Sequence, residues 1–133
     1  IDTVVLQARS YISTSAVPAA VAVAASTSLV LAAQESWRRE RLRELVDAFR
    51  TGVQHMDFEL THSATPIQAI IVGSSETALD WSKQLEAQGI LVAPIRPPTV
   101  PEGTARLRIT FSASHGDHHL RRLLDALAGL QKK

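Results

Sequence analysis

Two arginines in one alternating segment are the residues best placed to bind a charged group. Residues 105–111 alternate apolar and polar side chains, which is typical of a β-strand with one buried face. Arg106, Arg108 and Thr110 then project together from the polar face. An arginine on a rigid strand can hold a carboxylate or a phosphate through two parallel, charge-assisted hydrogen bonds. The same pattern also fits a solvated or ion-paired strand face, so both interpretations stay open.

The second candidate is a proline-rich loop directly before that strand. Three prolines fall within residues 96–103 and restrict the loop before any ligand arrives. Arg96 supplies a charge and Thr99 a hydroxyl, and both could bind a substrate. A plain connector between two strands could have the same composition.

Three histidines, His115, His118 and His119, cluster where the last helix is expected to begin. Two histidines four residues apart can share a metal ion. No further ligand can be placed beside them except Asp117, so we predict solvated histidines and no metal site. Ser114 and Asp117 have the spacing of a capping box for this helix. The chain has no cysteine, which excludes thiolate zinc sites and cysteine nucleophiles.

An α+β domain is expected to position these residues, with a small, mainly antiparallel sheet, helices on one face, and two preceding helices. Residues 1–34 would form interdomain or interface helices and residues 35–133 the α+β domain. Ser75 is the expected cap of one helix and Gly89 its stop. Hydrophobic periodicity and turn residues predict helices at 1–9, 19–34, 35–56, 75–88 and from 114 onward, and strands at 58–61, 67–72, 90–95 and 105–111.

Composition excludes two classes of partner. The net charge is +1, and glutamates are mixed with the arginines of residues 38–43, so we do not expect nucleic-acid binding. Residues 10–34 carry no charge and are long enough to span a bilayer. They are rich in Ala, Ser and Thr and contain Pro18, so we predict a helix packed between protein surfaces and no membrane span.

Three segments together resemble the C-terminal region of the α-oxoamine synthases. They are S-T-S at residues 13–15, I-R-P-P-T-V-P at residues 95–101, and G-T-A-R-L-R-I-T at residues 103–110, which S-A-S-H follows at residues 112–115. The second segment is similar to that of the 8-amino-7-oxononanoate synthases within the family.

This resemblance implies a fold and a reaction. The fold would be the aspartate-aminotransferase type (fold type I), with this chain as its C-terminal small domain. The enzyme would be a cytoplasmic homodimer that uses pyridoxal phosphate. It would join L-alanine to pimeloyl-CoA or a pimeloyl-carrier protein with loss of carbon dioxide, and the cofactor would serve as the electron sink.

The resemblance also implies residue roles. Arg108 matches the arginine that binds the amino-acid carboxylate, and Thr99 matches a loop threonine at the acyl-substrate site. Arg96 would lie near the same pocket without a role that the match assigns. Thr14 and Ser15 match hydroxyls that reach the cofactor phosphate of the neighbouring subunit. The Ala-Val-Pro that follows them departs from the family's usual Leu/Met-Pro-Pro, which puts that last match in doubt.

The family's cofactor lysine follows a histidine and precedes a turn of small residues, and no lysine here has that context. Lys83 falls within a predicted helix, while Lys132 and Lys133 end the sequence. A Schiff base needs a positioned, desolvated lysine. We therefore expect a fragment without a catalytic residue, inactive and free of cofactor on its own. Two alternatives are a stand-alone ferredoxin-like regulatory module that binds a carboxylate through Arg106 and Arg108, and an oligomerisation domain with the alanine-rich helix as its interface.

Overall fold

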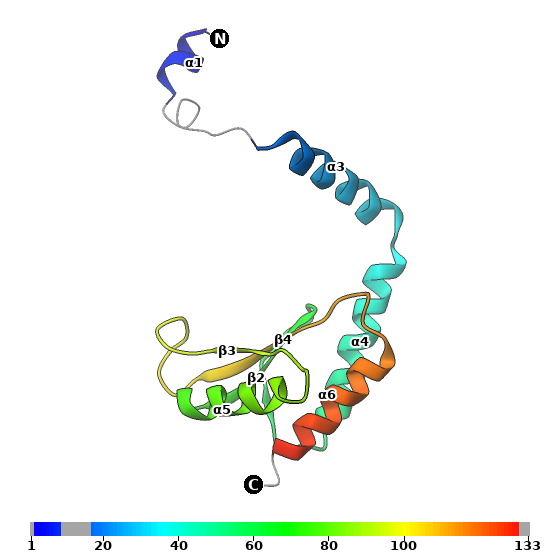
Figure 1. Ribbon diagram of the computed structural model, residues 1–133, viewed down its shortest axis with the longest axis vertical. Coiled ribbons are helices and arrows are strands. Elements are labelled where there is room, and N and C mark those ends of the chain that lie inside the picture. Colours follow the sequence, from blue (N-terminus) through cyan, green and yellow to red (C-terminus); the bar gives the residue numbers. More distant parts are fainter. Residues whose placement is uncertain (1, 9–16, 131–133) are drawn as a thin grey trace. The chain divides into compact units, whose positions relative to one another are not determined.

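The computed structural model describes residues 2–8 and 17–130 of the chain (Figure 1). The chain divides into two compact units, Ile1–Ser36 and Trp37–Lys133. Each unit is a separate body, and the candidate site described below lies within the second.

The first unit contains helices α1 (Asp2–Gln7) and α3 (Ala19–Gln34). Pro18 precedes α3 as its N-cap residue, where a fixed φ and a missing N–H are compatible with a helix start. No side chain of α3 is buried. In the described part of the chain no single helix is long and apolar enough to cross a membrane, and only α3 and α4 (Trp37–Val53) taken together pass such a test. The interface role of residues 1–34 stays a prediction.

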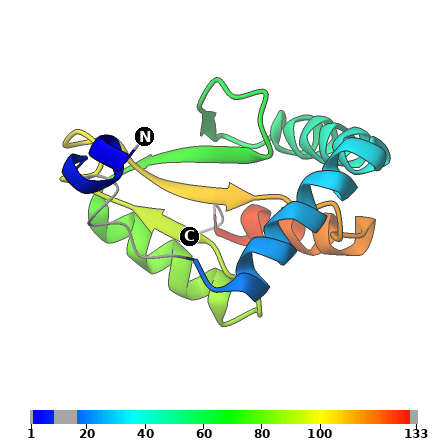
Figure 2. The same ribbon diagram turned by 90° about the horizontal axis from the view of Figure 1, so that it is seen from above.

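The second unit contains a four-stranded antiparallel sheet of order β1-β2-β4-β3. Helix α5 joins β2 to β3, and β4 lies between these two strands (Figure 2), so β4 is paired on both sides. After α4 the elements are β1 (Glu59–Leu60), β2 (Ile67–Gly73), α5 (Ser75–Glu86), β3 (Ala93–Ile95), β4 (Ala105–Thr110) and α6 (Asp117–Leu130). The predicted α+β class with a small antiparallel sheet is confirmed.

The predicted alternation of β4 is also confirmed. Leu107 and Ile109 are buried on the face that α5 covers (Figures 1 and 2). Arg106 on the opposite face is half-buried, and Arg108 and Thr110 are exposed. Among the described residues of this unit no helix covers that second face, so its side chains are available to a ligand or to another surface.

Helices α4 and α6 pack side by side and complete the core (Figure 1). The hydrophobic periodicity that predicted a helix at residues 35–56 forms a buried apolar stripe on α4. Leu45 and Phe49 are almost completely inaccessible, and Leu127 of α6 packs against them. The Phe49 ring lies 5.4 Å from the ring of Phe111, the residue after β4. Each such buried side chain contributes about 1.5–3 kcal/mol. This packing fixes the C-terminal end of the strand that carries the arginines.

Several predicted boundaries were wrong. Helix α4 ends at Val53 and not at residue 56, and α6 begins at Asp117 and not at residue 114. Strand β3 begins at Ala93, three residues later than expected, and Leu91 before it is 87% exposed. Strand β3 is an edge strand with a partner on one side only, so few hydrogen bonds hold the apolar residues that precede it in the sheet. The cap of α5 is Ser74 in place of Ser75: its extended backbone lets its hydroxyl oxygen accept the N–H three residues later. Gly89 has a positive φ of 75° and ends this segment as predicted.

Candidate functional site

Arg108 lies on the uncovered face of the central strand β4. Its cross-strand neighbours are Ala69 on β2 and Ala93 on β3, both with small side chains. The Arg108 side chain is exposed and has no hydrogen bond or ion pair with any residue that the structure describes. Its guanidinium therefore keeps all five N–H donors for a carboxylate or phosphate, held on a strand that is paired on both sides.

Arg106, two residues earlier on the same face, differs from Arg108 in its neighbours and its hydrogen bonds. Its cross-strand neighbours are the larger Ile71 and Ile95. Its Nε donates to the carbonyl of Thr104 at 3.1 Å, and its NH2 donates to the Thr104 hydroxyl at 3.2 Å. The sequence pattern alone does not distinguish the two arginines, and it assigned no role to Thr104. The spacing contained a signal, because residues two apart on a strand project from the same face.

The proline-rich loop connects β3 to β4 through residues 96–104, as predicted. The Thr99 N–H donates to the Arg96 carbonyl at 3.0 Å, which makes a tight turn. Both side chains are exposed and have no polar partner among the described residues. The last residue of β3 pairs with Arg106, so the loop leaves the sheet there. Arg108 is two residues further along β4, or roughly 7 Å.

The structure therefore places the loop of Arg96 and Thr99 at one end of the strand that holds Arg108. The binding roles of these three residues stay predictions. Thr14 and Ser15, the expected cofactor-phosphate hydroxyls, lie outside the described residues.

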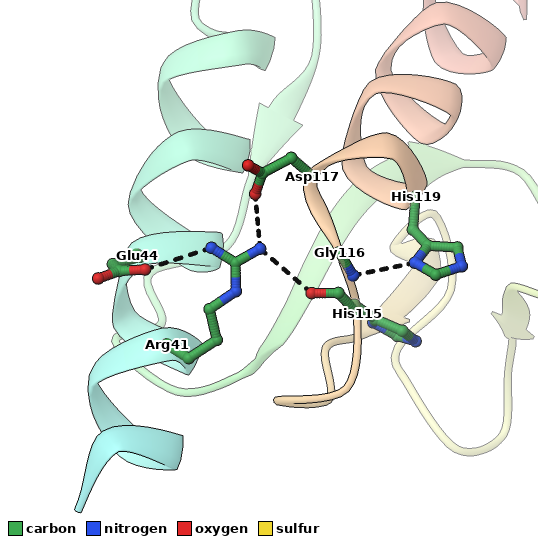
Figure 3. A network of polar contacts seen from close by, with 6 residues as sticks. All are labelled: Arg41, Glu44, His115, Gly116, Asp117 and His119. Atoms are coloured by element: carbon green, nitrogen blue, oxygen red, sulfur yellow. Dashed lines mark hydrogen bonds and ion pairs between the residues drawn. The ribbon is translucent and has the colours of Figure 1, made fainter.

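Beyond the other end of β4, a polar network fixes the turn into α6 (Figure 3). Arg41 of α4 donates to the carbonyl of His115 at 3.2 Å, to the carboxylate of Asp117 at 2.5 Å and to Glu44 at 3.2 Å. The hydrogen bond from Arg41 lowers the pKa of Asp117, and the same bond raises the pKa of Arg41. Local sequence patterns do not predict this use of Arg41, because two of its three partners lie more than 70 residues away along the chain.

The expected capping box of Ser114 and Asp117 is not formed, because α6 begins at Asp117, the Ser114 N–H donates to the Ser112 hydroxyl and the Asp117 carboxylate binds Arg41. The N–H of Gly116 instead donates to Nδ1 of His119 at 3.0 Å, so a histidine caps α6 (Figure 3). The ring of His118 stacks 3.8 Å from that of His119. Desolvation, and then electrostatic interaction with His118, His115 and Arg122, lower the pKa of His119. A neutral ring is the form that can accept this hydrogen bond.

These contacts give the histidine cluster a structural role. The Nδ1 of His115 also accepts a backbone N–H, that of Ser112, at 3.2 Å. An imidazole that accepts at Nδ1 carries its proton on Nε2, so neither His115 nor His119 offers a free ring lone pair in this state. Among the described residues no group of three or more His, Cys, Asp or Glu could hold a metal ion.

A cavity of about 260 Å³ lies inside this end of the unit. Apolar side chains dominate its wall, including Leu45, Phe111, Leu120 and Leu123. Arg96, Thr99 and Arg108 do not line it, so the predicted site lies on the open sheet face and not in this cavity.

Comparison with known families and proteins places this geometry in context. The family model for class I and II aminotransferases matches residues 1–127. Curated 8-amino-7-oxononanoate synthases from Nitrosococcus oceani and Stutzerimonas stutzeri are 52% and 54% identical over 127 and 128 residues. Both matches cover 96% of this chain but only 34% and 33% of those proteins, so the chain spans about a third of their length.

Solved structures show the same fold. A serine palmitoyltransferase from Sphingomonas wittichii has a TM-score of 0.87 and 26% identity over 98% of this chain and 33% of that one. A second, a lysine-to-alanine variant from S. paucimobilis with a bound aldimine of pyridoxal phosphate and myriocin, has a TM-score of 0.84 and 30% identity over the same shares. An 8-amino-7-oxononanoate synthase from Francisella tularensis has a TM-score of 0.78 and 25% identity over 98% of this chain and 37% of its own. The predicted resemblance and fold type are confirmed.

Proposed function

The chain belongs to the class I and II aminotransferase family, and we propose that it forms part of an 8-amino-7-oxononanoate synthase. The reaction is the condensation of L-alanine with a pimeloyl thioester, with loss of carbon dioxide and the thiol carrier. The observation that carries the proposal is Arg108, an arginine without a partner among the described residues, between two alanines on the open face of the central strand. The names of relatives about half identical to the chain support the choice of reaction.

Arg108 binds the alanine carboxylate in this proposal. Its planar guanidinium offers two parallel N–H donors that match the two carboxylate oxygens, and pairing within the sheet limits its backbone motion. Thr99 lies at the acyl-substrate site and Arg96 near it, on the loop that leaves the sheet two residues before Arg108. The acyl group arrives as pimeloyl-CoA or as a pimeloyl-carrier protein.

Pyridoxal phosphate is the implied cofactor, and it supplies the electron sink for the alanine carbon. The described residues do not include a lysine in the buried setting that a Schiff base needs. Lys83 is exposed on α5, and Lys132 and Lys133 lie outside the described residues. In our proposal the cofactor lysine comes from the part of the enzyme that this chain does not span. Thr14 and Ser15 reach the cofactor phosphate across a homodimer, and the enzyme is cytoplasmic.

The test uses the full-length protein with alanine and pimeloyl-CoA, measured by release of carbon dioxide and free CoA. We expect Arg108→Met to raise the KM for alanine roughly 10- to 100-fold, because a hydrogen bond to a charged group contributes about 1.5–3 kcal/mol. Arg108→Lys keeps the charge but not the two parallel donors, so its KM for alanine should lie between those of the wild type and Arg108→Met. Arg121→Met, on the exposed side of α6, is the matched control. An unchanged KM for alanine in Arg108→Met would refute the role of Arg108, and an inactive wild-type protein would refute the reaction.

A further inference from the structure

Arg106 contacts both ends of the loop that carries Thr99. Its backbone pairs with Ile95, the last residue of β3, where the loop begins. Its side chain binds Thr104, the last residue of the loop, through Nε to the carbonyl at 3.1 Å and NH2 to the hydroxyl at 3.2 Å. One residue therefore joins the start and the end of residues 96–104.

Thr104 extends this connection into the loop. Its hydroxyl accepts from Arg106 and donates to the carbonyl of Pro101 at 2.8 Å, so both functions of the hydroxyl are used. The Thr104 N–H donates to the same carbonyl at 3.2 Å. Hydrogen bonds therefore lead from the guanidinium of Arg106 through Thr104 to the carbonyl of Pro101, which lies two residues after Thr99 in the proposed acyl-binding loop.

The surroundings of Arg106 strengthen these bonds. Its side chain is half-buried between Ile71 and Ile95, which limits both its motion and the access of water. Hydrogen bonds from a charged donor are stronger than neutral ones, and more so where water is partly excluded. Arg108, with alanines at the equivalent positions, has no such restriction.

We propose that Arg106 is a positioning residue, which holds the loop of residues 96–104 in the conformation that receives the acyl thioester. The inference rests on the proposed function. A loop that is ordered before binding loses less conformational entropy when the substrate arrives. Loss of the Arg106 side chain should therefore weaken binding of the acyl donor and leave alanine binding at Arg108 intact.

The experiment measures KM for pimeloyl-CoA, KM for alanine and kcat in the full-length enzyme. We expect Arg106→Met to raise KM for pimeloyl-CoA roughly five- to tenfold, with KM for alanine and kcat within about twofold of wild type. Thr104→Val removes the hydroxyl and should shift the same KM in the same direction, whereas Thr104→Ser keeps the hydroxyl and should restore it. Because Arg106 and Thr104 act through one series of bonds, the double variant should fall short of the sum of the single effects.

Matched controls are Arg121→Met on α6 and Thr51→Val on α4, both at exposed positions. A rise in KM for alanine equal to that for pimeloyl-CoA would overturn the proposal, and so would unchanged values for both. The proposal would also be overturned if the KM for pimeloyl-CoA in Thr104→Ser were as high as in Thr104→Val.

A second readout separates this inference from the proposed reaction. If the wild-type enzyme does not condense alanine with pimeloyl-CoA, the reaction fails, and amide hydrogen exchange of the same full-length protein then tests Arg106. Faster exchange at the Thr99 and Thr104 amides in Arg106→Met, with the Leu107 amide unchanged, would support positioning of the loop. Unchanged exchange at Thr99 and Thr104 would overturn it.

Discussion

Substitution of glycine by alanine should have opposite effects on the free energy of unfolding at two helical positions. Gly52 is the next-to-last residue of α4, and Gly129 is the next-to-last residue of α6. A Cβ at Gly52 would lie 2.6 and 2.9 Å from the two methyl carbons of Leu124 and 3.3 Å from its Cγ. A Cβ at Gly129 would have no heavy atom within 4 Å. The pair therefore tests how closely α4 approaches α6.

The gain in helix stability and the steric cost together determine whether each substitution stabilises or destabilises the fold. Glycine to alanine within a helix stabilises by about 0.5–1 kcal/mol, so Gly129→Ala should raise the free energy of unfolding by that amount. Gly52→Ala has the same gain but a steric cost of about 1–3 kcal/mol from overpacking. Relief requires the Leu124 side chain to move, since both its methyls and its Cγ lie close to the added Cβ. We expect a net destabilisation of roughly 1 kcal/mol.

Urea unfolding of the chain, followed by circular dichroism, is the assay. With a slope of about 1–3 kcal/mol per molar urea, 1 kcal/mol moves the midpoint by roughly 0.3–1 M. Gly129→Ala should move it upward and Gly52→Ala downward. In a Leu124→Ala background the clash disappears, and Gly52→Ala should become stabilising. Equal stabilisation by Gly52→Ala and Gly129→Ala in the wild-type background would refute the close approach of the two helices.

Two further predictions concern protonation and the cofactor. The pKa of His119 is lowered by desolvation and by His118, His115 and Arg122, so its cap is complete above the unfolded pKa of about 6.5 and is lost as the pH falls through the lower folded pKa. The difference in urea midpoint between wild type and His119→Leu should shrink from pH 8 to pH 5, and a constant difference would contradict this. The 133-residue chain mixed with pyridoxal phosphate should show no stable internal-aldimine absorbance, because Lys83 is exposed on a helix. A stable band from the pure chain would overturn that expectation.

Local sequence patterns predicted the parts of the fold that local physics determines. The two-residue period of β4 and the apolar stripe of α4 each follow from one face turned to the core, and both are confirmed. Gln68 shows where the same rule is insufficient. It is a polar residue at a fully buried position of β2, where its side chain accepts from Arg50 and donates to the carbonyls of Ser63 and Thr65. Those partners lie in another helix and a loop, which the strand pattern does not contain.

The wrong predictions have the same cause. Ser114 and Asp117 have the spacing of a capping box, yet Asp117 pairs with Arg41, which arrives from a helix distant in sequence. The cap is then supplied by His119, a residue with little intrinsic preference for that role. Ser74 and Ser75 are chemically identical, and only the extended backbone of Ser74 selects it as the cap of α5. A tertiary contact in the first case and the local backbone conformation in the second decide among options that the sequence leaves nearly equal.

Arg106 and Arg108 show the same limit of local sequence rules at the candidate site. They share a residue type, a strand and a face, and no local rule assigns them different tasks. Sheet register separates them, because it places isoleucines beside Arg106 and alanines beside Arg108. Thr104 then engages Arg106, while Arg108 keeps its donors for a ligand. The resemblance to α-oxoamine synthases could point to Arg108, but the physical reason that this arginine and not its neighbour can bind a carboxylate lies in the pairing of three strands.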